Sequence, residues 1–283
     1  VAPVTFSARI APSLVGLGLL EAIPETTIMQ WADTDDADND GISGRPAEVI
    51  DPVTGDIRIG RFGYKAGTSS VLHQVSAALN TDMGVMTSVF PTPDCGSTQT
   101  SCDSTGQELV DSELEDLVKY ISLLGVGARR DYANSAGETL FDNIGCAGCH
   151  RPVMTTSEFH PLAELRNQTI HPYTDLLLHD LGPGLADNLG EGIASGSEWR
   201  TAPLWGIGHA PSVMLGDAKA NDEVSKDRDV NDLNRIGYLH DGRARNIDEA
   251  IRWHGGEGEV SKLAYEALLS TDKTALINFL NSL

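Results

Sequence analysis

The chain has little positive charge and no long hydrophobic run. Its 283 residues include 20 Lys and Arg against 41 Asp and Glu, which gives a formal net charge of −21. Such a surface is unsuited to nucleic acid or an anionic membrane; it either attracts a partner protein with a basic surface or serves solvation alone. The apolar segment from Leu14 to Leu20 is shorter than a membrane-spanning helix and is interrupted by glycine. We therefore expect no nucleic acid partner and no membrane span.

Cysteine is also scarce, and two of the four cysteines stand in one motif. Cys146 and Cys149 belong to a C-x-x-C-H sequence that ends at His150. This is the attachment site of c-type haem, in which both thiols add to the porphyrin vinyl groups and the adjacent His binds the iron. A zinc site would need two further Cys or His ligands, and a thioredoxin-like dithiol would need a βαβ context. We predict one haem c per chain, with a metal site or a redox dithiol as the alternatives.

The other two cysteines, Cys95 and Cys102, enclose a short segment of Gly, Ser, Thr and Gln. Bacteria assemble haem c on the outer side of the cytoplasmic membrane, and the chain starts at Val1 without an initiator Met. Both points favour an exported protein whose leader has been removed, in the periplasm or outside the cell. In an oxidising compartment Cys95 and Cys102 are expected to form a disulfide, the alternative being two free thiols.

Apolar spacing predicts a mainly α fold in two domains. Residues 1–130 form a helical, loop-rich domain, and residues 131–283 form a cytochrome c-like haem domain. The clearest helices are expected at Ser69–Leu79, Ser112–Leu124 and Thr271–Leu283, with weaker signals at Pro12–Glu21 and just before Cys146. A haem domain of this length must carry large insertions, of which the main one is expected at His160–Arg200.

An acidic segment resembles the start of a calcium-binding loop. Asp36, Asp38 and Asp40 fall at positions one, three and five of an EF-hand pattern, with glycine at position six. Position twelve holds Ala47 in place of the bidentate Glu, and no flanking helix pair is evident. We therefore predict a calcium loop of non-EF-hand type, formed by these three carboxylates and the carbonyl oxygen of Ile42. The alternative is a solvated acidic turn.

The second axial ligand of the iron is expected to be His254. Asn246 and Glu249 form a helix-starting pair, and Ile247, Ile251 and His254 share one face of the helix that follows. Met214, in an irregular loop, is the main competitor, and an open site is a further alternative. The full set of candidates is His73, His160, His171, His179, His209, His240, His254, Met154 and Met214.

Two basic residues upstream of that helix are candidate partners of the haem propionates. Arg243 and Arg245 could form charge-assisted hydrogen bonds with propionate carboxylates. The alternative is a pair of solvated arginines, whose contribution to stability would be small. We therefore include both residues among the cofactor-binding candidates.

Three runs of sequence resemble the di-haem cytochrome c peroxidase superfamily, and its di-haem oxidoreductase (thiol oxidoreductase-like) branch most closely. They are Arg200–Gly208, Tyr238–Arg245 and Ile247–Gly256, and further similar runs are Ala8–Glu21, Asp33–Gly44, Gly60–Lys65 and Tyr173–Asp180. The resemblance implies that His254 occupies the position of the distal haem ligand, which makes the haem bis-His and low-spin. It also implies a calcium ion near the haem pair.

One departure from that family affects the functional prediction. The family carries two C-x-x-C-H motifs, whereas this chain contains one. We therefore expect the chain to be the C-terminal part of a di-haem oxidoreductase or peroxidase-like enzyme, relaying electrons to or from a second haem domain. The alternative is a mono-haem electron-transfer cytochrome without catalytic activity, either alone or within a larger assembly, and served by a basic redox partner. Whether the chain itself is an enzyme stays open at this point.

Overall fold

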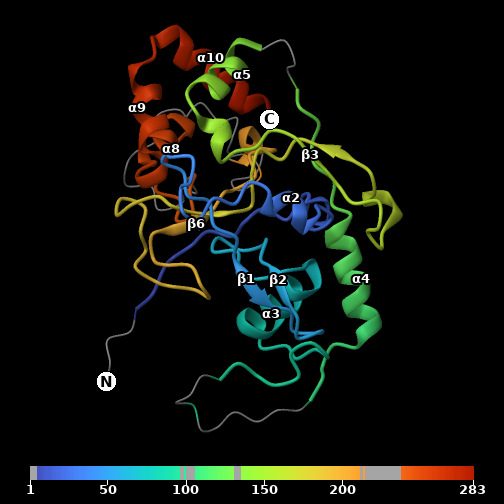
Figure 1. Cartoon of the computed structure of the whole chain (residues 1–283). Helices are drawn as coiled ribbons and strands as arrows, with labels where there is room; N and C mark the ends of the chain where they lie inside the picture. Colours follow the sequence, from blue (N-terminus) through green and yellow to red (C-terminus); the bar gives the residue numbers. More distant parts are fainter. Residues whose placement is uncertain (1–4, 96–98, 100–105, 131–134, 211–212, 214–236) are drawn as a thin grey trace.

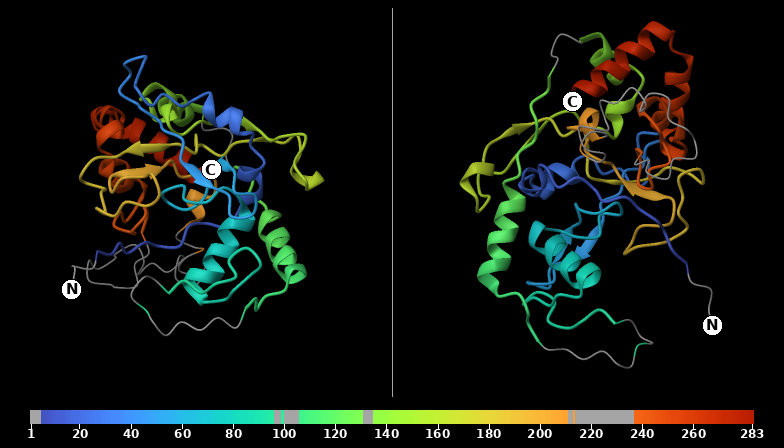
Figure 2. Two further views of the ribbon diagram at one scale, coloured as in Figure 1. Left: turned by 60° about the horizontal axis from the view of Figure 1, so that its bottom comes forward. Right: turned by 180° about the vertical axis from the view of Figure 1, so that it is seen from behind.

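The structure is a computed structural model that describes residues 5–95, 99, 106–130, 135–210, 213 and 237–283. Regular structure in these residues is mostly helical, with three short two-stranded antiparallel sheets. This agrees with the predicted mainly α class. Helices α5, α8, α9 and α10 gather at one end of the molecule, and α3 and α4 lie at the other with the hairpin β1–β2 (Figure 1). The view from behind shows the same division (Figure 2).

The first half of the chain contributes four helices and one hairpin among the described residues. The elements are α1 (Leu17–Glu21), α2 (Glu25–Met29), β1 (Glu48–Ile50), β2 (Ile57–Ile59), α3 (Val71–Met83) and α4 (Asp111–Ser122). Helix α3 begins two residues later than predicted, because Ser70 is its N-cap and accepts a hydrogen bond from the backbone N–H of His73 at 3.0 Å. Helix α4 starts one residue earlier than expected, with Val110 as its N-cap.

Helix α1 is shorter than the predicted Pro12–Glu21 helix. It starts after Gly16, which has a left-handed backbone conformation with φ 75°. A Cβ at Gly16 would lie 2.4 Å from the Trp205 ring and 2.6 Å from a Val126 methyl carbon. The tight packing and the left-handed turn therefore both require glycine at the residue where the helix begins.

The second half of the chain combines helices with short strands. The elements are α5 (Ser135–Asn143), η1 (Cys146–Gly148), β3 (Met154–Thr155), η2 (Ala163–Leu165), β4 (Thr169–Ile170), β5 (Leu178–Asp180), β6 (Glu198–Arg200), η3 (Ile207–His209), α8 (Ile247–Trp253), η5 (Gly256–Gly258), α9 (Glu259–Ala267) and α10 (Ser270–Ser282). Strands β4, β5 and β6 lie within the predicted insertion His160–Arg200, which showed few strand signals. Two or three residues are too few to display a strand periodicity.

Helices α5 and α10 pack against each other at the start and end of the second half. The predicted apolar stripe of α10 is confirmed: Leu276, Leu280 and Leu283 are buried, and Ile277 packs on the same cluster. Phe141 of α5 and Phe279 of α10 meet edge to face with ring centroids 5.6 Å apart. This pair of helices holds the segment that leads into the C-x-x-C-H motif.

A larger core joins the two halves of the chain. Leu114 and Ile121 of α4 belong to the same buried cluster as Met154, Ile170 and Leu177. The segments on either side of residue 130 therefore share apolar packing, and the division into domains 1–130 and 131–283 stays a prediction. Among the described residues, no helix is both long and apolar enough to cross a membrane.

Candidate haem site

The C-x-x-C-H motif lies on a short 3₁₀ turn directly after α5. Gly145 reverses the chain between them with φ 87°, and a Cβ there would lie 2.9 Å from the Ser261 hydroxyl oxygen of α9. Cys146 and Ala147 pack against the aromatic cluster of α5 and α10. The motif is therefore held in place by its packing against α5, α9 and α10.

Both cysteines of the motif are free thiols and are partly buried. Burial raises the pKa of Cys146 to about 12, and burial likewise raises the pKa of Cys149. A dithiol redox centre works through a thiolate of lowered pKa, so this setting does not suit it.

His150 is oriented for metal binding through its Nε2 atom. Its Nδ1 atom lies 2.9 Å from the carbonyl oxygen of Tyr173, which must accept the Nδ1 proton. Burial lowers the pKa of His150 to about 4, so the ring is neutral and Nε2 carries the lone pair. Phe141 lies beside the ring, with centroids 6.3 Å apart. A backbone acceptor on one ring nitrogen is the usual means of setting a ligating tautomer.

His254 shows the same arrangement at the end of α8. The predicted N-cap is confirmed, because Asn246 accepts a hydrogen bond from the N–H of Glu249 at 2.8 Å. The helix ends at Trp253, and His254 is its C-cap. The Nδ1 atom of His254 lies 2.9 Å from the carbonyl oxygen of Ala250, which again leaves Nε2 for a ligand.

The two imidazoles lie within electrostatic reach of each other. Burial lowers the pKa of His150, and a charge on His254 lowers it further. Burial also lowers the pKa of His254, with a smaller contribution from Lys262. Two partly buried, neutral rings with Nε2 available are the donor set that an iron porphyrin with two imidazole ligands requires. The residues present therefore fit a haem.

Four of the other candidate ligands in the described residues make contacts elsewhere. His160 bonds to Glu21 at 3.3 Å, and His240 stacks on Trp199 with centroids 3.8 Å apart. Met154 is buried in the large core. His73 lies on α3 beside Phe90. Met214 lies outside the described residues, so the structure does not compare it with His254.

The two arginines proposed for the propionates have carboxylate partners in the chain. Arg243 pairs with Asp241 at 2.6 Å, and its guanidinium lies 4.9 Å from the centroid of the Trp253 ring. Arg245 pairs with Glu249 at 2.7 Å on the exposed side of α8. Their role toward propionates stays a prediction.

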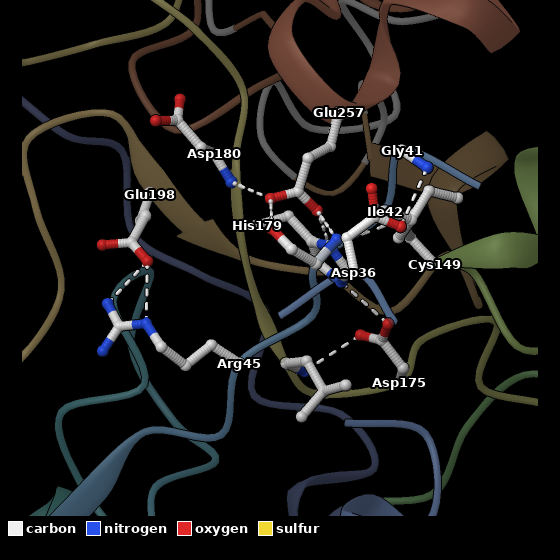
Figure 3. A network of polar contacts seen from close by, with 12 residues as sticks. Asp36, Gly41, Ile42, Arg45, Cys149, Asp175, His179, Asp180, Glu198 and Glu257 are labelled. Carbon is white, nitrogen blue, oxygen red and sulfur yellow. Dashed lines mark hydrogen bonds and ion pairs between the residues drawn. The ribbon is translucent and has the colours of Figure 1, made fainter. Parts of the chain in front are cut away.

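A polar network that sequence reasoning did not identify surrounds Cys149 (Figure 3). His179 of β5 lies with Nδ1 3.7 Å from the Cys149 sulfur and 2.6 Å from Glu257, while its Nε2 bonds to Asp175 at 2.9 Å. Burial lowers the pKa of His179, but hydrogen bonds to Asp175, Cys149 and Glu257 outweigh it and raise the pKa to about 12. His179 is therefore an imidazolium held between two carboxylates.

This network does not form a single metal site. Cys149, Asp175 and His179 place ligand atoms within 4.8 Å of one another. The two ring nitrogens of His179, however, point at different carboxylates on opposite sides of the ring. The zinc alternative therefore lacks convergent ligands here. A sequence signal did exist, since Asp175 and His179 both lie in the run Tyr173–Asp180.

The acidic loop brings together a set of carboxylates that differs from the predicted one. Asp33, Asp36 and Asp38 place carboxylate oxygens within 4.8 Å of one another. Asp40 is outside this set, and its carboxylate accepts the N–H of Ile42 at 2.8 Å. The acidic segment begins at Asp33, three residues before the first predicted ligand, but Asp33 is out of phase with the alternation of Asp36, Asp38 and Asp40, so the EF-hand pattern did not include it.

The loop also touches the C-x-x-C-H motif. A Cβ on Gly148 would lie 2.7 Å from the Cδ1 atom of Ile42, so glycine at this position lets the two segments pack. The next residue, Ser43, donates its backbone N–H and its hydroxyl to Glu257 at 3.0 and 2.9 Å. The acidic loop and the thiol motif are therefore parts of one site.

Comparison with known proteins now places the chain in a family. A family model described as "Di-haem oxidoreductase, putative peroxidase" matches residues 2–283. The chain belongs to the di-haem oxidoreductase family. This confirms the resemblance and supports a haem-based redox function for the chain. The assignment of Cys146, Cys149 and His150 to the haem stays a prediction.

Comparisons with curated proteins and with solved structures do not indicate an activity for the chain. No curated protein matches the chain. A solved chain from "Kuenenia stuttgartiensis Hydrazine Synthase Pressurized with 20 bar Xenon" is 15% identical, with 100% of this chain and 97% of that chain covered and a TM-score of 0.42. A similarity this weak says nothing about activity or assembly.

Proposed function

We propose that this di-haem oxidoreductase chain relays electrons through one haem c bound to Cys146 and Cys149, with His150 and His254 as axial ligands. The observation that carries the proposal is that the imidazoles of His150 and His254 share the same protonation state and the same hydrogen-bonding pattern. Each is partly buried and neutral, and each uses Nδ1 for a backbone carbonyl so that Nε2 carries the lone pair. When bound, the haem supplies reversible one-electron chemistry.

The protein's own contribution is to hold both ligands and to exclude water. The carbonyl of Tyr173 and the carbonyl of Ala250 orient the two rings. Two imidazole ligands leave no open axial position and favour a lower potential than a His and Met pair, because thioether sulfur favours the reduced state. A closed, low-spin centre suits electron relay better than reaction with peroxide.

The family description favours a second haem as the electron partner. This chain contains one C-x-x-C-H motif, so a second haem would come from another domain or another chain. A mono-haem electron-transfer cytochrome is the second candidate, and the single motif favours it. Haem count per chain and intact mass of the natural gene product separate the two.

Three further properties belong to the same proposal. A calcium ion would bind at the acidic loop, where hard carboxylate oxygens converge. Cys95 and Cys102 would form a disulfide, which fits export to the periplasm or beyond; Cys102 lies outside the described residues. The redox partner would present a basic surface to this acidic chain.

Replacing His254 tests the ligand assignment. His254→Gly should give a high-spin optical and EPR spectrum and bind added imidazole, whereas the control His73→Gly should keep the low-spin spectrum of the parent. Cys146→Ala combined with Cys149→Ala should abolish haem staining that survives acid acetone extraction. An unchanged low-spin spectrum in His254→Gly would move the second ligand to Met214 or to another histidine.

A further inference from the structure

The turn that follows His254 is rich in glycine, so its own residues restrict its backbone conformation little. Gly255, Gly256 and Gly258 follow the ligand closely, and Gly256 has a left-handed backbone with φ 52°. Glycines restrict the backbone least of all residues, so the direction of His254 depends on contacts made by other residues of the turn. The side chain between these glycines is Glu257.

Glu257 makes four hydrogen bonds with one carboxylate. Its Oε2 atom binds His179 at 2.6 Å and the N–H of Ser43 at 3.0 Å. Its Oε1 atom accepts the hydroxyl of Ser43 at 2.9 Å and the N–H of Asp180 at 3.0 Å. The side chain is 11% exposed, so these bonds replace most of its hydration. The partners come from two segments far from the turn in the sequence (Figure 3).

The partners of Glu257 are themselves fixed. His179 is held from its other side by Asp175 and lies beside the sulfur of Cys149. Gly256 packs so closely on β5 that a Cβ there would lie 2.2 Å from the Asp180 carbonyl oxygen. The turn is therefore fastened to the strand that touches the thiol motif, by close backbone packing and by an ion pair.

We propose that Glu257 is a positioning residue for the distal ligand, and that its bonds to His179 and Ser43 hold the turn that follows His254. The inference rests on the proposed bis-His function and deepens it. Without this carboxylate the turn would keep its backbone packing on β5, and His254 would keep its bond to Ala250, but the ion pair to His179 and the bonds to Ser43 would be lost. His254 would then leave the iron more often, and an outside ligand could enter.

Glu257→Gln tests the proposal because glutamine preserves the shape and removes the charge. The holo variant should show a larger high-spin fraction than the parent. It should bind added imidazole faster by about tenfold or more, as expected for the loss of a charge-assisted hydrogen bond. The matched control is Glu266→Gln, which removes an exposed carboxylate on α9 that pairs with Arg252 at 3.3 Å. It should match the parent in both measurements.

Ser43→Ala provides a second, milder test if Glu257→Gln fails to accumulate as holo protein. It removes one hydrogen bond to Glu257 from the opposite side of the site, so it should shift spin state and imidazole binding in the same direction by a smaller factor. If folded Glu257→Gln and Ser43→Ala both match the parent while His254→Gly opens the iron, the positioning role is wrong and the ligand assignment stands. If His254→Gly stays low-spin, the ligand assignment itself is wrong.

Discussion

Gly137 of α5 and Ala275 of α10 touch backbone to backbone where the two helices cross. A Cβ on Gly137 would lie 2.3 Å from the Ala275 carbonyl oxygen and 2.6 Å from the Phe279 Cβ. The helices can therefore approach this closely only with glycine at this position. Because α5 runs into Gly145 and Cys146, the crossing also determines where the thiol motif lies.

Gly137→Ala should lower the free energy of unfolding by about 1–3 kcal/mol, the usual cost of inserting a methyl group into a packed contact. Urea unfolding followed by circular dichroism measures it. Gly127→Ala is the matched control, since a Cβ at Gly127 meets nothing within 4 Å, and it should change stability by less than about 0.5 kcal/mol. Equal stabilities of the two variants would contradict the crossing contact.

The acidic loop should bind calcium through the carboxylates that the structure groups together. Metal analysis of protein purified without chelator should find calcium in the parent and none in Asp36→Asn combined with Asp38→Asn. Asp33→Asn should weaken binding more than Asp40→Asn, because Asp33 is within the cluster and Asp40 is outside it. Asp116→Asn, on α4, serves as control. A calcium-free parent protein would leave the loop as an acidic turn.

The prediction of a disulfide between Cys95 and Cys102 is checked by counting thiols. Holo protein that is unfolded without reductant should show no titratable thiol, because the other two cysteines carry the haem. After reduction two thiols should appear. Two thiols before reduction would refute the disulfide, and a Cys95→Ser variant, with one thiol from Cys102, calibrates the count.

The carboxylate of Asp187 should make the free energy of unfolding fall as the pH is lowered below about 4. Burial raises the pKa of Asp187, but hydrogen bonds from Ser7 and Arg9, the N–H of Leu189 and the charge of Lys65 outweigh it and hold the pKa well below its ordinary range. A carboxylate with a lowered folded pKa stabilises above its unfolded pKa near 4, and the contribution is lost as pH falls through the folded value.

Asp187→Asn should therefore cost about 1.5–3 kcal/mol at pH 7, the range for hydrogen bonds to charged groups, and progressively less below about pH 4. Urea unfolding at several pH values gives the difference between variant and parent. The control Asp116→Asn should show a small difference at every pH. A cost for Asp187→Asn that stays constant down to pH 2 would show that its charge is not responsible.

Much of the site could be predicted from the sequence because it depends on neighbours in the chain. The spacing of Cys146, Cys149 and His150 defines an attachment motif without reference to any other segment. The start of α8 at Asn246 and the apolar stripe of α10 follow from capping and from helical periodicity. The role of His254 as a ligand was predicted from its place at the end of that helix and from the family resemblance, and it stays a prediction.

Only the tertiary structure decided which distant groups surround these residues. Glu257 meets Ser43 across 214 positions of the chain and His179 across 78. Likewise, the carbonyl of Tyr173 that orients His150 lies 23 positions away. Such hydrogen bonds depend on how strands and turns pack, and no local spacing encodes them. A sequence determines a motif where its parts are neighbours, whereas the partners of a buried charge are set only when the chain has folded around it.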